Sequence, residues 1–462
     1  MGNGAWKYWV VAPILAAALW AAGSRAAQEK TQPKAFNSTV AFKVVALIGE
    51  KDEVLGIGST PSAQPLTIPP CKWWYVEPRR PVDMEKVRQD IEAQGIPGLG
   101  LFGVATDADV EHLKGLRRLE YLDLSRTYVT DAGLEHLKGL TRLQHLSLYG
   151  TQVTNAGLEH LKALTALHEL VLSFTRVTDA GLVNLKGLTA LDCLDLDNTR
   201  VMDAGLEHLK GLTGLEVLKL GGTKVTGAGL AHLRGLTALQ KLVLIGAQVT
   251  DAGLEHLKGL TALQKLDLQF DYEVTDAGLE HLKGLTALQE LDLRFDYEVT
   301  DAGLEHLKGL ATLQHLNLAH TRVTDRGLNY LKGLTALNWL GLAGTQVTDA
   351  GLADLKGLTA LQTLILDNTR ITDTGLQHLK GLPTLQWLDL GDTQVTDAGL
   401  ERLKGHTVLV DLNLAGTKVT DAGLEHLKGL TALQYLDLAG TQVTKAGVEQ
   451  LNKSLPNVEV SR

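Results

Sequence analysis

Cysteine is nearly absent from this chain of 462 residues, which contains only Cys71 and Cys193. Two cysteines cannot form the framework of several disulfides that stabilises many small secreted domains. We expect Cys193 to be a small residue within a strand, and a single Cys71–Cys193 disulfide is the alternative. The stability of the fold must therefore come from packing.

A basic surface is missing as well, because 53 Asp and Glu residues outnumber 44 Lys and Arg residues and give a formal net charge of −9. Binding to nucleic acid requires clustered positive charge, so nucleic acid is not an expected partner. The sequence also lacks a glycine-rich phosphate loop, a G-x-S-x-G motif and an H-E-x-x-H motif. We therefore predict a non-enzymatic protein with no catalytic residues, no cofactor and no metal site.

Long hydrophobic runs are confined to the N-terminal end, where Val10–Ala22 is apolar. This run is shorter than the ~20 residues that a membrane-spanning helix needs. Lys7 precedes it, and Ser24-Arg25-Ala26 provides the small residues of a cleavage site. We predict that residues 1–26 are a signal peptide and that the protein is exported, to the periplasm or as a secreted protein, with no membrane span after cleavage. An uncleaved signal anchor is the alternative.

The next part of the sequence, residues 27–81, reads as a polar linker and a small N-terminal segment. Its apolar runs Val40–Gly49 and Val54–Gly58 predict a hairpin. The aromatic run Trp73–Tyr75 is either a packing plug that covers the end of the following array or an exposed patch. Residues 82–104 are expected to form a capping helix followed by a degenerate copy of a repeat.

From Ala105 onward the sequence repeats with a period of 24 residues, which defines fourteen full copies over residues 105–442 and a partial capping copy over residues 443–462. A representative copy, Val419–Gln442, reads VTDAGLEHLKGLTALQYLDLAGTQ. Leu436 and Leu438 alternate with polar neighbours, which predicts a short strand. Each copy therefore carries one strand in its second half.

The first half of each copy has the signals of a short helix. In the representative copy, Leu424, Leu427 and Leu430 have helical spacing, Thr420 is placed to cap the N-terminus and Asp421 suits the positive end of the helix dipole. Gly429 is expected to end the helix. A glycine at position 423 costs ~1 kcal/mol relative to alanine. Its recurrence predicts a close approach of backbone there.

The strand half, L-x-x-L-x-L-x-x-T, resembles the leucine-rich-repeat signature with Thr in the usual Asn or Cys position. The helix half, VTDAGLxxLxxL, is similar to repeats of exported bacterial leucine-rich-repeat proteins and of F-box receptors. The resemblance implies an α/β solenoid shaped as a curved horseshoe, with parallel strands on the concave face and short helices on the convex face. It also implies a recognition scaffold that binds a protein or peptide through the concave face. No F-box-like segment precedes the repeats, so a ubiquitin-ligase role does not follow.

Histidine recurs in one position of the outer, helical half of the copies. A metal-binding or pH-sensing ladder is one interpretation, and a solvated helix face is the other. Zinc ligands must lie ~2 Å from one ion, whereas neighbouring helices stand ~8–10 Å apart, which favours the solvated face. The residues in this position are His112, His136, His160, His208, His232, His256, His281, His306, His378 and His426.

The inner, strand half varies between copies and contains the candidate binding site. Trp339, Trp387 and Tyr435 occupy the same concave position in every second strand, which predicts a row with a spacing of ~9.6 Å. Large aromatic side chains beside hydrogen-bonding groups are typical of binding hot spots. Two alternatives remain open, a glycan or cell-envelope binder that uses this aromatic row and a structural spacer without a ligand. The candidate ligand-binding residues are Trp339, Thr363, Trp387, Asp389, Asp411, Tyr435 and Asp437.

Two adjacent copies, residues 249–273 and 274–298, are one residue longer than the others and carry Phe-Asp-Tyr-Glu after the strand. Asp271 and Asp296 are candidates to replace the hydrogen bond of the missing Thr. Lys265 and Glu290 should be lateral neighbours that form a pair. The aromatic side chains either fold inward as packing or project as a rim patch, which would consist of Phe270, Tyr272, Phe295 and Tyr297.

Overall fold

The computed structural model describes residues 34–48, 53–71, 73–79, 82–103 and 105–462. The predicted signal peptide, residues 1–26, lies outside the described residues. The chain divides into two compact units, of which unit 1 comprises Met1–Val225 and Gly235–Leu242, and unit 2 comprises Thr226–Arg234 and Val243–Arg462. Within the part of the chain that the structure describes, no helix has the length and apolar character that a membrane span requires.

Unit 1 begins with antiparallel strand pairs. Strand β1 (Lys34–Phe36) pairs with β4 (Leu66–Ile68). Strand β2 (Phe42–Ile48) lies between β3 (Glu53–Ser59) and β5 (Trp73–Pro78) and is antiparallel to both. The pairing of β2 with β3 confirms the predicted hairpin.

Strand β5 contains the aromatic run and joins this sheet to the repeats. It pairs in parallel with β6 (Gly98–Gly100), the first strand of the array, so the edge of the array is covered. Trp74 and Tyr75 are buried, and Tyr75 stacks on Tyr121 with ring centroids 4.7 Å apart. The packing interpretation of this run is therefore the one that the structure shows.

Helix α2 (Met84–Gln94) confirms the helix expected in this segment. The Asp83 side chain accepts hydrogen bonds from the backbone N–H groups of Glu85 and Lys86 at its start. Gly95 ends it in the left-handed conformation, with φ of 62°.

The repeats of unit 1 contribute three-residue strands, each parallel to the previous one from β6 to β11. These strands are β7 (Tyr121–Asp123), β8 (His145–Ser147), β9 (Glu169–Val171), β10 (Cys193–Asp195) and β11 (Val217–Lys219), and β12 (Lys241–Val243) falls at the boundary of the units. The helices are α3 (Asp107–Glu111), α4 (Asp131–Glu135), α5 (Asn155–Leu158), α6 (Asp179–Leu182) and α7 (Asp203–Leu206), with 3₁₀ helices η1 (Glu159–Leu161), η2 (Val183–Leu185) and η3 (Glu207–Leu209).

The repeats of unit 2 continue the same pattern, with parallel pairing from β13 to β21. The strands are β13 (Lys265–Asp267), β14 (Glu290–Asp292), β15 (His315–Asn317), β16 (Trp339–Gly341), β17 (Thr363–Ile365), β18 (Trp387–Asp389), β19 (Asp411–Asn413), β20 (Tyr435–Asp437) and β21 (Glu459–Ser461). The α-helices are α8 (Asp251–Leu254), α9 (Asp276–Leu279), α10 (Asp301–Leu307), α11 (Asp325–Leu328), α12 (Asp349–Leu352), α13 (Asp397–Leu400), α14 (Asp421–Leu424) and α15 (Lys445–Asn452). The 3₁₀ helices are η4 (Gly229–Leu233), η5 (Glu255–Leu257), η6 (Glu280–Leu282), η7 (Asn329–Leu331), η8 (Ala353–Gly357), η9 (Gly375–Gly381) and η10 (Glu401–Leu403).

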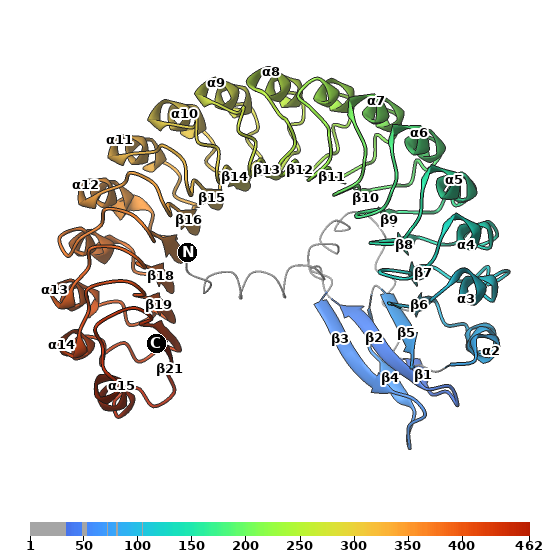
Figure 1. Cartoon of the computed structure of the whole chain (residues 1–462), viewed down its shortest axis with the longest axis horizontal. Coiled ribbons are helices and arrows are strands. Elements are labelled where there is room, and N and C mark those ends of the chain that lie inside the picture. The colour runs from blue at the N-terminus through green and yellow to red at the C-terminus, as the bar shows by residue number, and fades with distance from the viewer. Residues whose placement is uncertain (1–33, 49–52, 72, 80–81, 104) are drawn as a thin grey trace. The chain divides into compact units, whose positions relative to one another are not determined.

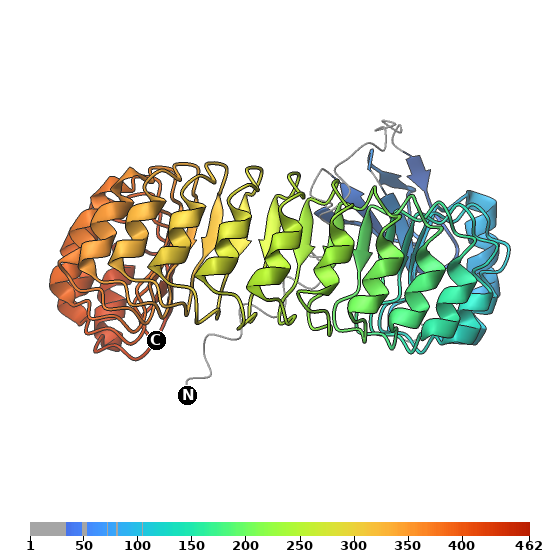
Figure 2. The same cartoon turned by 90° about the horizontal axis from the view of Figure 1, so that it is seen from above.

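Within each unit, the strands form one face, here called the inner face, and the helices lie in a row on the other (Figures 1 and 2). The leucines of every copy lie between these layers. In the representative copy Leu427, Leu430 and Leu438 are fully buried. Burial of one such side chain contributes ~1.5–3 kcal/mol, and stacked copies are needed to achieve it. The predicted α/β solenoid is therefore confirmed in both units.

The helices are shorter than the sequence predicts. Helix α14 ends at Leu424, so the expected helix that runs to Gly429 is wrong, and Gly429 does not adopt a left-handed conformation. The physical reason is the spacing of the leucines, which recur every third residue at 424, 427 and 430. A period of three matches the 3₁₀ helix and tight turns better than the 3.6-residue α-helix.

In most copies a carboxylate at the start of the helix links one copy to the next. Thr348 donates two hydrogen bonds to Asp325, from its backbone N–H to Oδ1 over 2.7 Å and from its hydroxyl to Oδ2 over 2.6 Å. We call this paired contact the Asp–Thr clasp. In unit 1 the same contact joins Asp131 to Thr154. The Asp of the VTDAGL motif is therefore a link between copies, beyond the helix-dipole role that its position indicates.

The recurrent glycine of VTDAGL makes room for this clasp. A Cβ at Gly351 would lie 2.5 Å from Asp325 Oδ1 and 3.0 Å from Leu328 Cδ1. The predicted close approach is confirmed, but the nearest neighbouring atoms belong to side chains and not to backbone. A Cβ at Gly429, in contrast, would have no neighbouring atom within 4 Å.

We expect Gly351→Ala to lower the free energy of unfolding by ~1–3 kcal/mol, because the added methyl group overpacks the clasp. Gly429→Ala is the matched control and should change stability by less than ~0.5 kcal/mol, since the space beside it is open. Urea unfolding followed by circular dichroism measures both. Equal losses in the two variants would contradict the role assigned to Gly351.

Candidate functional site

The inner face of unit 2 contains the predicted aromatic row. The register of β16–β20 places Trp339, Thr363, Trp387, Asp411 and Tyr435 beside one another in successive strands. The aromatic side chains therefore occupy alternate strands, as the sequence predicts. The exposure and the contacts of each ring decide whether it is available to a partner.

The three aromatic residues are not equivalent. Trp339 is half-buried and stacks on His315, with ring centroids 4.0 Å apart and planes inclined by 3°. Its ring also covers Gly341, where a Cβ would lie 2.6 Å from the indole. Trp387 is 46% exposed and Tyr435 is 50% exposed, and neither ring stacks on another among the described residues. Trp387 and Tyr435 are thus available to a partner, whereas Trp339 is used in packing.

Carboxylates surround the two exposed rings. The predicted residues Asp389, Asp411 and Asp437 lie on β18, β19 and β20. Two further carboxylates were not among the candidate ligand-binding residues, Asp367 two residues after the end of β17 and Glu459 on β21, where it lies in register with Tyr435. A count of the charges at each inner position would have revealed both of them.

These carboxylates lie close enough to influence one another. Burial, together with the charge of Asp389, raises the pKa of Asp367 to about 7. Burial, together with Asp389 and Asp437, raises the pKa of Asp411 to about 6. Burial also raises the pKa of Asp389, although hydrogen bonds from Gly391 and Asn413 oppose the shift. Burial is the larger cause of these shifts, and the neighbouring carboxylates add to it.

Several acidic residues elsewhere on the inner faces have basic partners, whereas Asp267 accepts hydrogen bonds from the amide of Gln269. In unit 1 the Lys219 ammonium lies 2.9 Å from Asp195, and both side chains are buried. In unit 2 the predicted pair of Lys265 and Glu290 forms, which confirms that expectation. The other pairs are His145 with Glu169 in unit 1 and Arg294 with Asp292 in unit 2.

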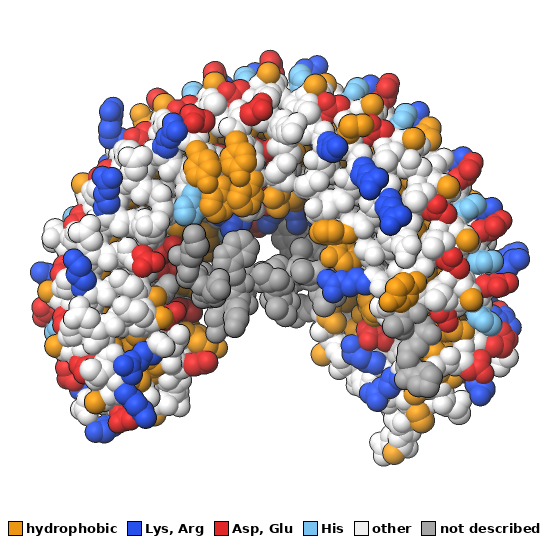
Figure 3. All heavy atoms as spheres, in the orientation of Figure 1, with side chains coloured by type: hydrophobic (Ala, Val, Ile, Leu, Met, Phe, Trp, Pro, Cys, Tyr) orange, Lys and Arg blue, Asp and Glu red, His pale blue; other side chains and the backbone are white. Residues whose placement is uncertain are grey.

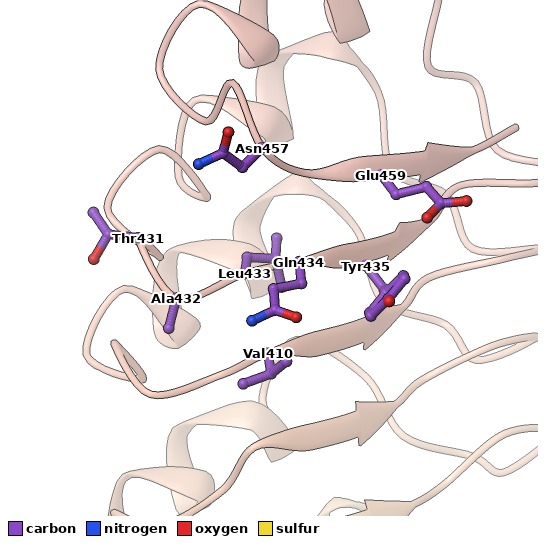
Figure 4. A pocket seen from close by; sticks show the side chains of 8 residues that line it. All are labelled: Val410, Thr431, Ala432, Leu433, Gln434, Tyr435, Asn457 and Glu459. Carbon is purple, nitrogen blue, oxygen red and sulfur yellow. The ribbon is translucent and has the colours of Figure 1, made fainter. Parts of the chain in front are cut away.

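A shallow pocket opens at the last strands of unit 2 (Figure 4). Tyr435 and Glu459 project from neighbouring strands at one side of it, so the exposed ring and a carboxylate border the same hollow. The lining residues are Val410, Thr431, Ala432, Leu433, Gln434, Tyr435, Asn457 and Glu459.

The aromatic side chains of the two longer copies form a rim in which Phe270, Tyr272 and Tyr297 are exposed and Phe295 is half-buried, which agrees with the second of the two alternatives. Phe270 stacks on Phe295 at 4.6 Å, and Phe295 stacks on His320 at 4.5 Å. Tyr272 stacks on Tyr297 at 5.8 Å, and both tyrosines are exposed. Figure 3 shows hydrophobic side chains gathered on the rim at β13 and β14.

The backbone beneath this rim is left-handed. Phe270 and Phe295 have φ values of 64° and 67°, in the position where Gly344 and Gly416 have 63° and 68°. A residue with a Cβ loses ~1–2 kcal/mol in this conformation. Stacking of aromatic side chains returns ~0.5–1.5 kcal/mol for each pair, which offsets part of the cost.

Asp271 and Asp296 take the position of the missing Thr, as predicted, and are fully buried. Asp271 accepts a hydrogen bond from the backbone N–H of Val249, and Asp296 accepts one from that of Asp271. The second oxygen of each carboxyl has no hydrogen-bond partner among the described residues. Burial raises the pKa of Asp271 to about 9 and that of Asp296 to about 10. Both groups are therefore neutral acids at pH 7.

The cysteines and the possible metal ligands are the remaining candidates from the sequence. Cys71 and Cys193 are both free thiols, so the alternative of a disulfide between them is wrong. Among the described residues, no three or more His, Cys, Asp or Glu side chains converge as metal ligands would.

Comparison with known proteins agrees with this architecture. The family model described as Leucine Rich repeat matches residues 309–331 and 381–404. No curated protein matches the chain by sequence.

Several solved structures are similar to this chain in fold. An internalin from Listeria monocytogenes is similar, with a TM-score of 0.56 and 25% identity over 71% of this chain and 88% of that chain. A leucine-rich-repeat protein from Leptospira interrogans has a TM-score of 0.60 and 19% identity, covering 82% and 92% of the two chains. A TDR receptor has a TM-score of 0.50 and 14% identity, covering 81% and 68%. These likenesses show that the fold is that of a leucine-rich-repeat solenoid.

We expect Asp271→Asn with Asp296→Asn to stabilise the protein increasingly as the pH rises. A raised folded-state pKa gives stability that is complete below the unfolded pKa of ~3.9 and is lost as the pH rises through the folded values of about 9 and 10. The loss reaches ~1.4 kcal/mol per pH unit for each group, and Asn removes it while keeping an acceptor oxygen.

Thermal unfolding between about pH 5 and about pH 9 measures the effect, since the stability difference should develop over this range. The exposed Asp392 supplies the control Asp392→Asn. A constant difference between the double variant and the parent across this range would show that the two carboxyls do not titrate as described.

Proposed function

We propose that this protein is a non-enzymatic recognition scaffold that binds a protein or peptide through the inner face of unit 2, at β18–β20. The observation that carries the proposal is the exposure of Trp387 and Tyr435 on a sheet face, beside carboxylates and without ring partners among the described residues. Solenoids of this type commonly use such extended faces for binding. Trp and Tyr are the residues that most often dominate binding energy at protein interfaces.

The aromatic rim on Phe270 and Phe295 supports binding less directly, because its rings already stack on one another. A glycan stacked on the row is the second candidate, favoured by the flat faces of Trp387 and Tyr435. Residues 1–26 and the likeness of VTDAGLxxLxxL to exported bacterial repeats support export, and an exported protein would meet its partner outside the cytoplasm.

We expect the full chain to select peptides from a random display library, and Trp387→Ala with Tyr435→Ala to weaken their binding about tenfold or more, because truncation of hot-spot aromatics costs ~2 kcal/mol or more. Trp339 is left intact, since its removal would also destroy the stack on His315. Tyr128→Ala with Phe174→Ala is the matched control, as both residues are exposed aromatics of unit 1.

A glycan array with the same variants completes the test. Binding of glycans but not of peptides, lost in the Trp387 and Tyr435 variant, would favour the second candidate. No binding in either format would leave a structural spacer as the function and would refute the proposal.

A further inference from the structure

The inner face of β17–β21 has an unusual balance of charge. We call this region the acidic aromatic surface and define it by the exposed rings of Trp387 and Tyr435 and the carboxylates of Asp367, Asp389, Asp411, Asp437 and Glu459. None of its strand positions that face inward is Lys or Arg. These positions hold Thr363, Ile365, Trp387, Asp389, Asp411, Asn413, Tyr435, Asp437, Glu459 and Ser461.

We propose that the acidic aromatic surface binds an extended peptide segment that carries Arg or Lys side chains, with the cations held between the carboxylates and the faces of Trp387 and Tyr435. This inference rests on the proposed function and names the chemistry of its partner. It rests on the absence of Lys and Arg from the surface, on the exposure of its aromatic rings beside carboxylates and on the spacing of these groups.

The first argument is charge complementarity. Several inner-face carboxylates of other strands are matched by cations of the protein itself, as in Lys219 with Asp195 and Arg294 with Asp292. The five carboxylates of the acidic aromatic surface have no such ion pair among the described residues. A basic partner would supply the missing cations, and complementary charge of this kind selects one partner over others.

The second argument is the combination of groups. A guanidinium donates hydrogen bonds to carboxylates and also stacks on aromatic faces, so it uses both features of the surface at once. An apolar partner would bury Asp389 and Asp437 without compensation, which is costly. A bound metal ion would need ligands that converge, and no such group of three is present among the described residues.

The third argument is spacing. Trp387 and Tyr435 lie two strands apart, which corresponds to ~9.6 Å, and the same holds for Asp389 and Asp437. Three residues of a peptide in the polyproline II conformation span ~9.3 Å, and every third side chain then faces the same side. A peptide that runs across the strands would therefore place a basic residue at every third position opposite equivalent sites.

The test uses a short fluorescent peptide with Arg at every third position in a Ser and Thr background. Matched peptides carry Gln or Glu in place of Arg, and fluorescence anisotropy measures the affinity of the full chain for each. We expect binding of the Arg peptide only. Asp389→Asn with Asp411→Asn and Asp437→Asn should weaken it about tenfold or more, because charge-assisted hydrogen bonds are lost.

A control variant of equal charge separates local recognition from general attraction. Glu255→Gln with Glu280→Gln and Glu305→Gln removes three carboxylates from exposed outer positions, where they pair only with nearby lysines. This variant should bind like the parent. Equal weakening in the inner and outer variants would overturn the inference, since the attraction would then be general.

Acidification should also weaken binding between about pH 8 and about pH 5, because protonation removes the charges that attract the peptide. The groups that face Asp411 and Asp367 are Asp389, Asp437 and Asp392, and all of them are acidic. Affinity that is independent of pH and of salt would contradict a role for these carboxylates.

The outcome of the library selection distinguishes this inference from the proposed function. Enrichment of Arg and Lys among peptides that need Trp387 and Tyr435 supports both. If peptides need these two residues but are not enriched in basic residues, the proposed function stands and the inference fails. If only glycans bind, both fail.

Discussion

The Asp–Thr clasp is the contact on which the regular stacking of this protein depends. In most copies one carboxylate accepts a backbone and a hydroxyl hydrogen bond from the next copy, as Asp397 does from Thr420. Hydrogen bonds to a charged acceptor are worth ~1.5–3 kcal/mol each. The clasp explains three letters of VTDAGL together, because Thr donates, Asp accepts and Gly leaves space for the carboxylate.

One copy of unit 1 carries an altered form of the Asp–Thr clasp. In unit 1, Asn155 stands in place of Asp and still joins Thr178, accepting from the backbone N–H and donating from its amide to the hydroxyl. A neutral amide can therefore replace the carboxylate and still make two hydrogen bonds with the Thr. With the leucine core and the clasp fixing the outer half of each copy, the inner half is free to vary. The charges and aromatic rings on the inner face therefore differ from strand to strand.

Much of the fold can be predicted from the local sequence pattern. The alternation of Leu436 and Leu438 fixes which strand positions face inward, and a strict period fixes the register, so the order of Trp339, Trp387 and Tyr435 could be predicted. Helix length could not, because leucines spaced by three satisfy both α and 3₁₀ geometry. The start of the helix could be predicted from Thr420, whose side chain accepts a hydrogen bond from the backbone N–H of Ala422.

The site was predicted less completely, because its properties depend on neighbours in other copies. The stack of Trp339 on His315 joins side chains of two strands, and sequence spacing alone gives no ring orientation. The neutral state of Asp271 and Asp296 follows from burial beneath the rim, which the inserted residue does not reveal. The gathering of like charges near Asp411 becomes visible only when inner positions are read across strands.

Photocrosslinking from the inner face tests the central claim most directly. A photoreactive phenylalanine in place of Tyr435 should capture an Arg-containing peptide in the full chain, and the same residue in place of the exposed Tyr128 should not. Capture at position 435 that excess unlabelled peptide abolishes is the predicted result. Equal capture at both positions, or capture at position 128 alone, would contradict the assignment of the acidic aromatic surface as the binding face.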